Sequence, residues 1–542
     1  MTGGDLLVSA LAAGGVDTVF GLPGVQLDGF FDALSRRSDL RVIHTRHEQA
    51  TSYMADGYAR VSKTGVGCCA VVPGPGVLNA LAGLSTAYAC NSRVFCVAGQ
   101  VRSDLIDSGL GLLHEIPNQL GVLRSVAKWV ERADQADRIP ELVATAFREL
   151  RSGRPRPVAL EVPLDVLEAT VVSGFPGNDE SSAAKGPGFP GNVEETAALD
   201  RMAERLLAAE RPLITAGGGV VQARAGALLQ DLAERLQAPV LVSQNGRGAL
   251  PTDHELAFDT LSAGALVAAA DVVLAVGTRF AGPGGRRRRL QPGQSLLRID
   301  ADPEELARDV EPELAVAADA GAGLSALLAR LDGRPPAAGW DGLEAVRAEA
   351  EERRSSLQPQ AALGAAIRAA LPADSVVVNG MTQVGYWGRI GFQVLQPGTF
   401  LTAGYQGTLG FELPLALGAQ AALPDRRVLA IVGDGGFLFN AQELATAVQH
   451  RLNVIAVVFN DGAYGNVRRI QAQRYGGRLI ASDLHNPDFV RLADAFGALG
   501  LRAEGPEALG AAIRQALQVD RPAVIEVPVG EMDDPWPLLL SN

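Results

Sequence analysis

The 542-residue sequence has few cysteines, few aromatic residues and no long apolar run. No stretch approaches the roughly 20 apolar residues that cross a bilayer. The opening MTGGDLLVSALAAGG lacks the basic region of a signal peptide and is typical of an amphipathic helix. The rare cysteines show no CxxC spacing, so we expect buried, reduced thiols at Cys68, Cys69, Cys90 and Cys96. These absences predict a cytoplasmic protein with no membrane partner.

Positive charge is also scarce, because 48 Lys and Arg face 61 Asp and Glu and leave a net charge of −13. Binding a nucleic-acid backbone needs clustered cations, so a nucleic acid is excluded as the expected partner. A small anionic substrate stays open, because a few local basic residues can override the global charge. Glycine, in contrast, is abundant (62 residues). That abundance suits many tight turns between strands and helices.

The chain is too long for one hydrophobic core, so several domains are expected. Two segments rich in Gly and Pro, 174–192 and 333–339, are typical of linkers. They divide the sequence into three domains that we expect at residues 1–172, 193–332 and 345–542.

Short apolar runs alternate with longer amphipathic stretches in every domain. Examples are VGCCAVV at 66–72, DVVLAVGTRF at 271–280 and RRVLAIVGDGG at 426–436. Uniformly apolar strands separated by helices indicate parallel sheets that are covered on both faces. We therefore predict an α/β fold of three doubly wound parallel-sheet domains. The similar endings ALEVPLDV (159–166) and AVIEVPVGE (523–531) predict that the first and third domains share one topology.

Two carboxylates follow neighbouring apolar runs in the third domain. Asp434 follows the run VLAIV with only Gly433 between them, and Asp461 follows the next such run, NVIAVVF, with only Asn460 between them. Ligands bind at the carboxyl ends of parallel strands, where two carboxylates and turn carbonyls form a hard oxygen site for Mg²⁺ or Ca²⁺. Such a cation would bridge to a diphosphate, with help from the amides of Gly435 and Gly436. A strand-ending aspartate that only caps a helix is the structural alternative.

An ionisable cluster also ends an apolar run in the first domain, in RVIHTRHEQATSYMADGYAR (41–60). Alone, Glu48 is equally typical of a helix N-terminus. The combination, however, resembles the thiamine-diphosphate enzymes, in particular acetolactate synthase, benzaldehyde lyase and their relatives. They carry HEQxA…ADGYAR, then PGPG (here Pro73–Gly76), and later a GDG turn followed, one helix and one strand on, by two asparagines. Residues 401–420, LTAGYQGTLGFELPLALGAQ, are similar to the family's GTMGFGLPAAIGAQ.

The resemblance implies a cofactor site built from the first and last domains. In the family the glutamate bonds N1′ of the aminopyrimidine, which here is Glu48. The metal ligands become Asp434, Asp461 and the carbonyl of Ala463, with Asp461 departing from the usual asparagine. Leu409 stands where a large apolar residue wedges between the cofactor rings, although core packing would also explain it. The complete cofactor-binding set implied is Glu48, Pro73, Gln383, Gly407, Leu409, Gly433, Asp434, Gly435, Gly436, Asp461, Ala463, Tyr464 and Gly465.

Glu48 has a clear chemical task in this hypothesis. The C2–H of thiamine is a poor acid, and the 4′-imino group of the cofactor must remove its proton. A carboxylate that shares a proton with N1′ favours the imino tautomer, an acid–base contribution of roughly 10²–10⁴-fold. The resemblance further implies pyrimidine-binding, central and diphosphate-binding domains in that order. It also implies a homodimer or homotetramer with active sites at the chain interface.

The implied reaction is the formation of an enamine, an acyl anion equivalent, from a 2-oxo acid or acyloin and its transfer to an acceptor carbonyl. His114 falls where decarboxylases of the family carry a histidine, and Gln26 follows a PG turn, so both are candidate catalytic residues. Val25 stands in place of the aspartate of pyruvate decarboxylases, which speaks against simple aldehyde release. Ile470 replaces the tryptophan of anabolic acetolactate synthases. The basic stretch 464–485 is a candidate lid.

The central domain offers weak evidence for FAD. AGGG at 216–219 suits a nucleotide, but the HGT and RFDDR segments of acetolactate synthase are replaced by LSAG and RFAGPGG. The run Arg286–Arg289 is more typical of a solvated loop than of a phosphate site. We therefore expect a flavin-independent carboligase or lyase that uses thiamine diphosphate and Mg²⁺. Acetolactate synthase proper, a flavin-linked 2-oxo acid oxidase and a catalytically silent cofactor-binding scaffold are the alternatives.

Overall fold

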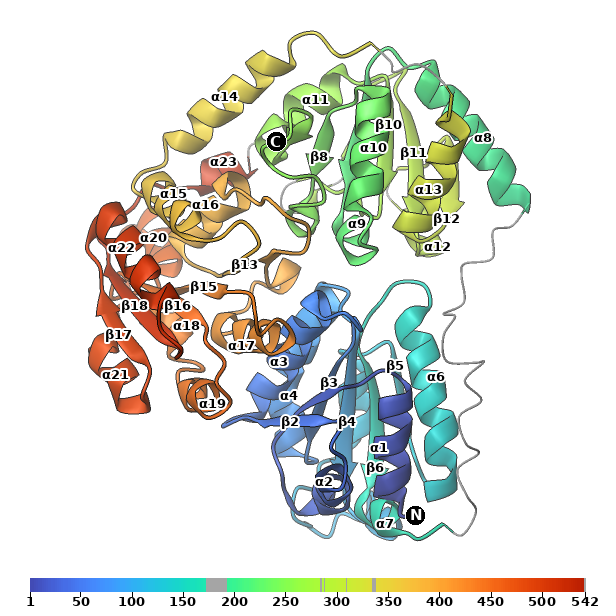
Figure 1. Ribbon diagram of the computed structural model, residues 1–542, viewed down its shortest axis with the longest axis vertical. Coiled ribbons are helices and arrows are strands. Elements are labelled where there is room, and N and C mark those ends of the chain that lie inside the picture. The colour runs from blue at the N-terminus through green and yellow to red at the C-terminus, as the bar shows by residue number, and fades with distance from the viewer. Residues whose placement is uncertain (172–192, 283–284, 287, 309, 334–337, 541–542) are drawn as a thin grey trace.

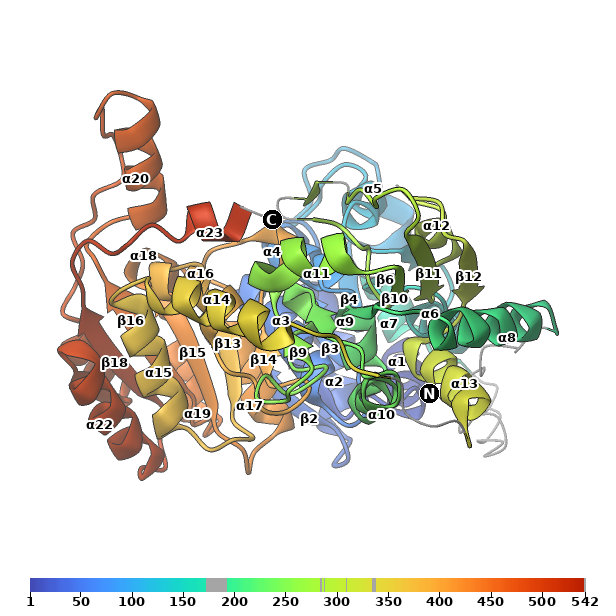
Figure 2. The ribbon, with the colours of Figure 1, turned by 90° about the horizontal axis from the view of Figure 1, so that it is seen from above.

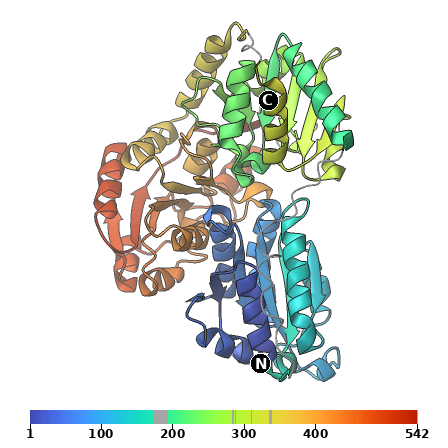
Figure 3. The ribbon, with the colours of Figure 1, turned by 45° about the vertical axis from the view of Figure 1, so that its right-hand side comes forward.

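The computed structural model describes residues 1–171, 193–282, 285, 286, 288–308, 310–333 and 338–540. The first predicted linker, 174–192, lies outside these residues, as does most of the second. The described chain forms three six-stranded sheets, and every strand pair within them is parallel. Helices cover both faces of each sheet (Figures 1 and 3). The predicted α/β class with three doubly wound domains is confirmed.

The first sheet has the order β2-β1-β3-β4-β6-β5. Its strands are β1 (Thr18–Gly21), β2 (Arg41–His44), β3 (Gly67–Val71), β4 (Val94–Gln100), β5 (Trp129–Arg132) and β6 (Val158–Pro163). The helices are α1 (Gly3–Ala13), α2 (Asp28–Ser35), α3 (Glu48–Val61), α4 (Pro75–Ala89), α5 (Gln119–Arg124), α6 (Ile139–Arg151) and α7 (Leu164–Glu168). The predicted N-terminal helix is α1, which Thr2 and Asp5 begin with a capping box.

The central sheet has the order β12-β11-β10-β7-β8-β9. From the adjacent strands β7 and β10, later strands are added outward in opposite directions across the sheet. Its strands are β7 (Pro212–Ala216), β8 (Val240–Val242), β9 (Ala257–Phe258), β10 (Val272–Val276), β11 (Ser295–Asp300) and β12 (Leu314–Ala317). Its helices are α8 (Val193–Leu207), α9 (Gly218–Gln222), α10 (Gly226–Leu236), α11 (Ala263–Ala269), α12 (Pro303–Leu306) and α13 (Ala320–Leu331).

The third sheet, β14-β13-β15-β16-β18-β17, repeats the order of the first, which confirms the predicted shared topology. Its strands are β13 (Val376–Asn379), β14 (Phe400–Leu401), β15 (Val428–Gly433), β16 (Ile455–Asn460), β17 (Leu499–Arg502) and β18 (Ala523–Pro528). The helices are α14 (Leu343–Ser355), α15 (Gln360–Ala370), α16 (Gln383–Gly391), α17 (Glu412–Ala422), α18 (Asp434–Phe437), α19 (Glu443–Gln449), α20 (Gly465–Arg474), α21 (Phe489–Phe496), α22 (Gly505–Leu517) and α23 (Trp536–Leu540).

The first and third domains share one hydrophobic core through helices α3 and α17. Two glycines allow this close packing. A Cβ at Gly57 of α3 would lie 2.0 Å from the carbonyl oxygen of Leu415, and a Cβ at Gly418 of α17 would lie 1.9 Å from that of Met54. Because the backbones touch directly, the middle of α3 packs closely against the third domain.

The structure also bears on the expectations for cysteines and membrane-spanning helices. The four cysteines are free and buried, as predicted. Across the described ranges, no helix combines the length and apolarity needed to cross a membrane.

Helix α20 projects from the third domain, away from the rest of the molecule (Figure 2).

Candidate active site

Asp434 and Asp461 lie side by side at the carboxyl edge of the third sheet. They follow the paired strands β15 and β16, which are in register at Gly433 and Phe459. Asp434 is the first residue of α18 and is buried. Asp461 is half-buried, and its Oδ1 accepts a hydrogen bond from the amide of Ala463 at 3.2 Å. The structure thus brings the three predicted metal ligands together.

The electrostatics of this pair favour a bound cation. Burial raises the pKa of Asp434 above its ordinary value. Burial, and then the neighbouring charge of Asp434, raise the pKa of Asp461 to about 6. Asn486 offsets part of the charge, because its Nδ2 donates to Asp434 Oδ2 at 2.6 Å and to Asn460 Oδ1 at 2.9 Å. Two adjacent carboxylates that are hard to ionise together are the arrangement that a divalent cation relieves.

The donors present fit a metal that is shared with a phosphate ligand. In the described ranges no group of three or more His, Cys, Asp or Glu could hold a metal ion alone. A metal held here would take its remaining ligands from a carbonyl, such as that of Ala463, and from a diphosphate. The side-chain oxygen of Gln383, the first residue of α16, is buried and has no hydrogen-bond partner in the described chain. This orphaned polar group marks the same edge as a place for a polar ligand.

Small residues of the predicted set line this edge. The ring of Tyr464 packs so closely on Gly435 that a Cβ there would lie 2.6 Å from Cε1. A Cβ at Gly465 would lie 2.2 Å from Asp461 Oδ2. In this structure the amide of Gly435, one of the two predicted to assist the diphosphate, donates to Asp434 Oδ1 at 2.8 Å.

Leu409 lies half-buried on a loop between β14 and α17. Gly407 and Gly410 flank it with φ of 56° and 81°, a left-handed backbone that glycine adopts without strain. The carbonyl of Gly410 accepts a hydrogen bond from Asn440 Nδ2 at 2.7 Å. Asn440 therefore anchors the loop directly after Leu409.

Glu412 lies directly behind this loop and was not singled out from the sequence, although it stands where the quoted family segment has glycine. It is buried at the start of α17, and Oε1 accepts a hydrogen bond from the amide of Met381 at 3.1 Å. Oε2 has no partner in the described chain. Burial raises the pKa of Glu412 to about 7.

Glu48 is the first residue of α3, and its carboxylate is half-buried. Its Oε2 accepts a hydrogen bond from Asn79 Nδ2 at 3.0 Å. Asn79 comes from α4, four residues after the start of that helix at Pro75. Asn79 comes three residues after the PGPG segment (Pro73–Gly76), but only the structure shows that it bonds Glu48.

His114 and Gln26 form a pair, although they are far apart in sequence. The Nδ1 atom of His114 lies 3.1 Å from Gln26 Oε1, and Gln26 Nε2 donates to the carbonyl of Leu113 at 3.0 Å. His114 has a φ of 68°, and its carbonyl packs on Gly74, next to the predicted Pro73. Both candidate catalytic residues are thus in one place, in the first domain.

Within one chain, two separate groups of predicted site residues result. Among the described residues no hydrogen bond or ion pair joins Glu48 to Asp434 or Asp461. Glu48, Gln26, His114 and Pro73 belong to the first domain, and the remaining predicted residues belong to the third.

The candidate lid, 464–485, includes α20, none of whose residues is buried. Val467 is 49% exposed, so it faces solvent in the single chain. The C-terminal segment holds the base of the helix, because Trp536 Nε1 donates to Asn466 Oδ1 at 2.7 Å and Asp534 pairs with Arg469. The candidate lid therefore has a base bonded to the C-terminal segment and an exposed tip.

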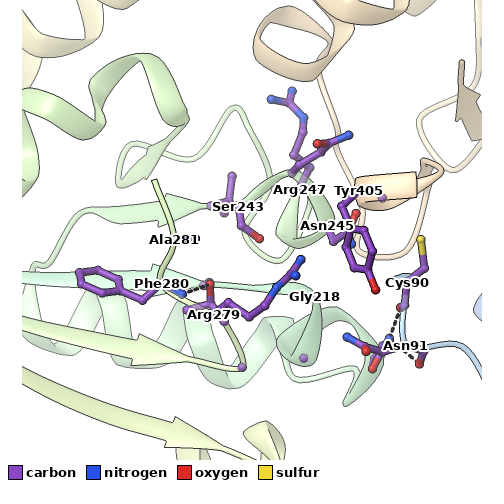
Figure 4. A pocket seen from close by; sticks show the side chains of 18 of the residues that line it. Cys90, Asn91, Gly218, Ser243, Asn245, Arg247, Arg279, Phe280, Ala281 and Tyr405 are labelled. Atoms are coloured by element: carbon purple, nitrogen blue, oxygen red, sulfur yellow. Dashed lines mark hydrogen bonds between the residues drawn. The ribbon is translucent and has the colours of Figure 1, made fainter. Parts of the chain in front are cut away.

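A cavity of about 950 Å³ lies between the central domain and the other two (Figure 4). Its lining includes Gly218 of the AGGG turn, Arg279, Arg288 and, from the third domain, Tyr405 and the predicted Gly407. Of the predicted arginine run, Arg286 and Arg289 are exposed and Arg288 is half-buried. The cavity thus adjoins the loop that carries Leu409, but Asp434 and Asp461 do not line it.

Comparison with known proteins agrees with this arrangement. Residues 1–122, 199–327 and 380–527 match the N-terminal, central and C-terminal domain models of the thiamine pyrophosphate enzymes. The chain is 38% identical to the probable 2-ketoarginine decarboxylase AruI of Pseudomonas aeruginosa, over 92% of this chain and 88% of that protein. It is 33% identical to a probable acetolactate synthase large subunit of Methanocaldococcus jannaschii, over 97% and 92%. It is 31% identical to the acetolactate synthase isozyme 3 large subunit of Escherichia coli, over 100% and 97%.

Sheet order, the paired carboxylates and these matches lead to one assignment. The chain belongs to the thiamine pyrophosphate enzyme family, in its acetolactate synthase-like group, and is a thiamine-diphosphate-dependent carboligase or decarboxylase.

Proposed function

We propose that the protein is a flavin-independent, Mg²⁺-dependent carboligase or lyase that takes its acyl unit from a 2-oxo acid or an acyloin. The observation that carries the proposal is the placement of Glu48. In the described chain Asn79 is the one side chain that bonds its carboxylate, through Oε2. The other oxygen is left for N1′ of the cofactor, where Glu48 holds the shared proton.

Thiamine diphosphate, when bound, supplies a carbon nucleophile and an electron sink for 2-oxo acid chemistry. The residues of the third domain would hold it. Asp434, Asp461 and the carbonyl of Ala463 offer the hard oxygen ligands that Mg²⁺ takes, and the cation would bind the diphosphate. Leu409 would contact the rings, and Gln383 would contact the diphosphate.

His114 is the proposed proton carrier at the substrate. The Gln26 amide donates through Nε2 to Leu113, so its oxygen faces Nδ1 of the imidazole. Nδ1 must then carry the hydrogen of this contact, and Nε2 is left to exchange a proton with the substrate. Gln26 acts as the group that sets this tautomer.

The proposed active unit is a homodimer or homotetramer in the cytoplasm. Its support is that, among the described residues of one chain, no hydrogen bond or ion pair joins Glu48 to Asp434. If the first domain of one chain faced the third domain of another, both groups would reach one cofactor. The proposed boundaries are 1–172 for the pyrimidine-binding domain, 193–332 for the central domain and 345–542 for the diphosphate-binding domain.

The Glu48→Gln variant tests the proposal, because it keeps the size of the side chain and removes the acid. We expect the variant to bind thiamine diphosphate and Mg²⁺ within about tenfold of wild type, or roughly 1.4 kcal/mol. Exchange of the cofactor C2 proton, followed by NMR in deuterated buffer, should slow by about 10²-fold or more. Unchanged exchange would overturn the role of Glu48 and favour a silent scaffold.

Two substrate assignments are favoured by specific relatives. The identity to a probable 2-ketoarginine decarboxylase favours decarboxylation of a 2-oxo acid with a guanidinium end. The identity to acetolactate synthases favours transfer of the acyl unit from pyruvate to a second pyruvate. Mass spectrometry of products from a panel of 2-oxo acids and aldehydes, including both donors, separates these from a more general carboligase.

A further inference from the structure

Glu443 links the third domain to the residues directly before Glu48. It is the first residue of α19 and is fully buried. Its Oε1 accepts hydrogen bonds from the amides of Arg46 at 3.1 Å and His47 at 3.0 Å. Its Oε2 accepts from the amide of Arg46 at 3.2 Å and from Thr446 Oγ1 at 2.6 Å. One carboxylate therefore satisfies two backbone amides of another domain.

These amides belong to the turn that delivers Glu48 to the start of α3. His47 is the N-cap residue, with extended backbone, and its Nδ1 accepts from the amide of Gln49 at 3.1 Å. The amides of Arg46 and His47 precede the helix and so have no acceptor inside it. The carboxylate of Glu443 fixes both, and its charge lies at the favourable N-terminal end of a 14-residue helix.

We propose that Glu443 is a positioning residue for Glu48, which acts by holding the backbone of Arg46 and His47. The proposal rests on the activating role proposed for Glu48. Glu443 does not touch the reacting atoms; it sets the direction in which the activating carboxylate leaves the turn. Glu48 must form a hydrogen bond with one nitrogen of the cofactor. A small shift of the turn would therefore lengthen that hydrogen bond and slow the activation of the cofactor.

Glu443 is itself anchored to the other half of the machinery. Its amide donates to the carbonyl of Asn440 at 3.0 Å, and the Asn440 side chain holds the carbonyl of Gly410, beside Leu409. In the proposed dimer, the domain that holds the cofactor of one site would thus position the acid of the other site.

Two variants of the full-length protein test the proposal, Glu443→Ala and Glu443→Gln. In the cofactor-free protein, the amides of Arg46 and His47 should lose protection from hydrogen exchange in both variants, because their acceptor is removed or weakened. With saturating thiamine diphosphate and Mg²⁺, C2-proton exchange should slow by about 10- to 100-fold in Glu443→Ala and by less in Glu443→Gln. Cofactor affinity, measured by calorimetry, should change by less than about threefold, since Asp434 and Asp461 are intact.

A double variant distinguishes positioning from a general loss of structure. If Glu443 acts through Glu48, the variant Glu48→Gln/Glu443→Ala should exchange C2 as slowly as Glu48→Gln alone. Glu507→Gln, an exposed glutamate in the first turn of α22, is the control and should leave every readout unchanged. Normal C2 exchange in both Glu443 variants, or additive losses in the double variant, would overturn the proposal. A wild-type protein that fails to accelerate C2 exchange would instead overturn the proposed function.

Discussion

The imidazole Nδ1 of His114 lies 3.1 Å from the side-chain oxygen of Gln26, a contact that spans 88 positions of the chain. The Leu113 carbonyl orients the Gln26 amide, so the pair has a defined direction. His114 also adopts a left-handed backbone, with a φ of 68°, which is uncommon for a residue with a side chain. Such a conformation persists only where the surrounding structure holds it.

The first prediction follows from this pair. We expect His114→Ala to lower kcat by about 10²-fold, because a positioned proton carrier is lost. The affinity for thiamine diphosphate should stay within about twofold, since the metal and diphosphate residues lie in the third domain. His254→Ala is the matched control, because His254 pairs with Glu234 in the central domain. Equal losses of cofactor binding and turnover would show that His114 is structural.

The second prediction concerns Asp461, whose pKa of about 6 in the metal-free protein makes cation binding compete with a proton. As the pH falls below 6, wild-type affinity for Mg²⁺ should decrease by up to about tenfold per pH unit. Asp461→Asn should bind Mg²⁺ more weakly at neutral pH, but with a shallower pH dependence. Calorimetric titration of Mg²⁺ at constant thiamine diphosphate over this pH range measures both slopes. Parallel slopes would remove Asp461 from the proposed ligand set.

The third prediction concerns stability and the buried Glu412. Its folded-state pKa of about 7 lies above its ordinary value of 4.5, so the folded state keeps the proton up to a higher pH than the unfolded state. The stability contribution is therefore fully present below pH 4.5 and is lost as the pH rises through 7. The loss is on the order of 3 kcal/mol at most.

Glu412→Gln removes this titration, and so the cofactor-free variant should lose less stability than wild type between acidic and alkaline pH. Denaturant unfolding across this range measures the difference. Glu344→Gln, at an exposed glutamate in the first turn of α14, is the control and should follow the wild-type curve. A Glu412→Gln curve parallel to that of wild type would mean that Glu412 is ionised in the folded protein without cost.

The fourth prediction is that the purified protein carries no flavin. The segments LSAG and RFAGPGG stand where acetolactate synthase has HGT and RFDDR. The cavity beside the central domain is large and lined by arginines, so its volume alone does not decide the question. A visible absorbance band of oxidised flavin that survives desalting would contradict the prediction.

The sequence by itself determined the fold class and most of the candidate cofactor site. Apolar strands at regular intervals predict parallel sheets, because only strands covered on both faces are apolar throughout. The positions of Asp434 and Asp461 at strand ends place them at one sheet edge, and local motifs mark Glu48 and Leu409. These properties are local or periodic, so each can be recognised in one continuous stretch of sequence.

Only the tertiary structure decided which residues support that site. Asn79 reaches Glu48 from another helix, and Asn486 reaches Asp434 from 52 residues away. Glu443 accepts hydrogen bonds from the amides of Arg46 and His47 across a domain boundary, and Glu412 accepts one from the amide of Met381. Such contacts join segments that have no fixed spacing in sequence, and only the packing of the folded chain brings these segments together. Hydrogen bonds between distant segments therefore depend on tertiary packing, and a local sequence pattern does not predict them.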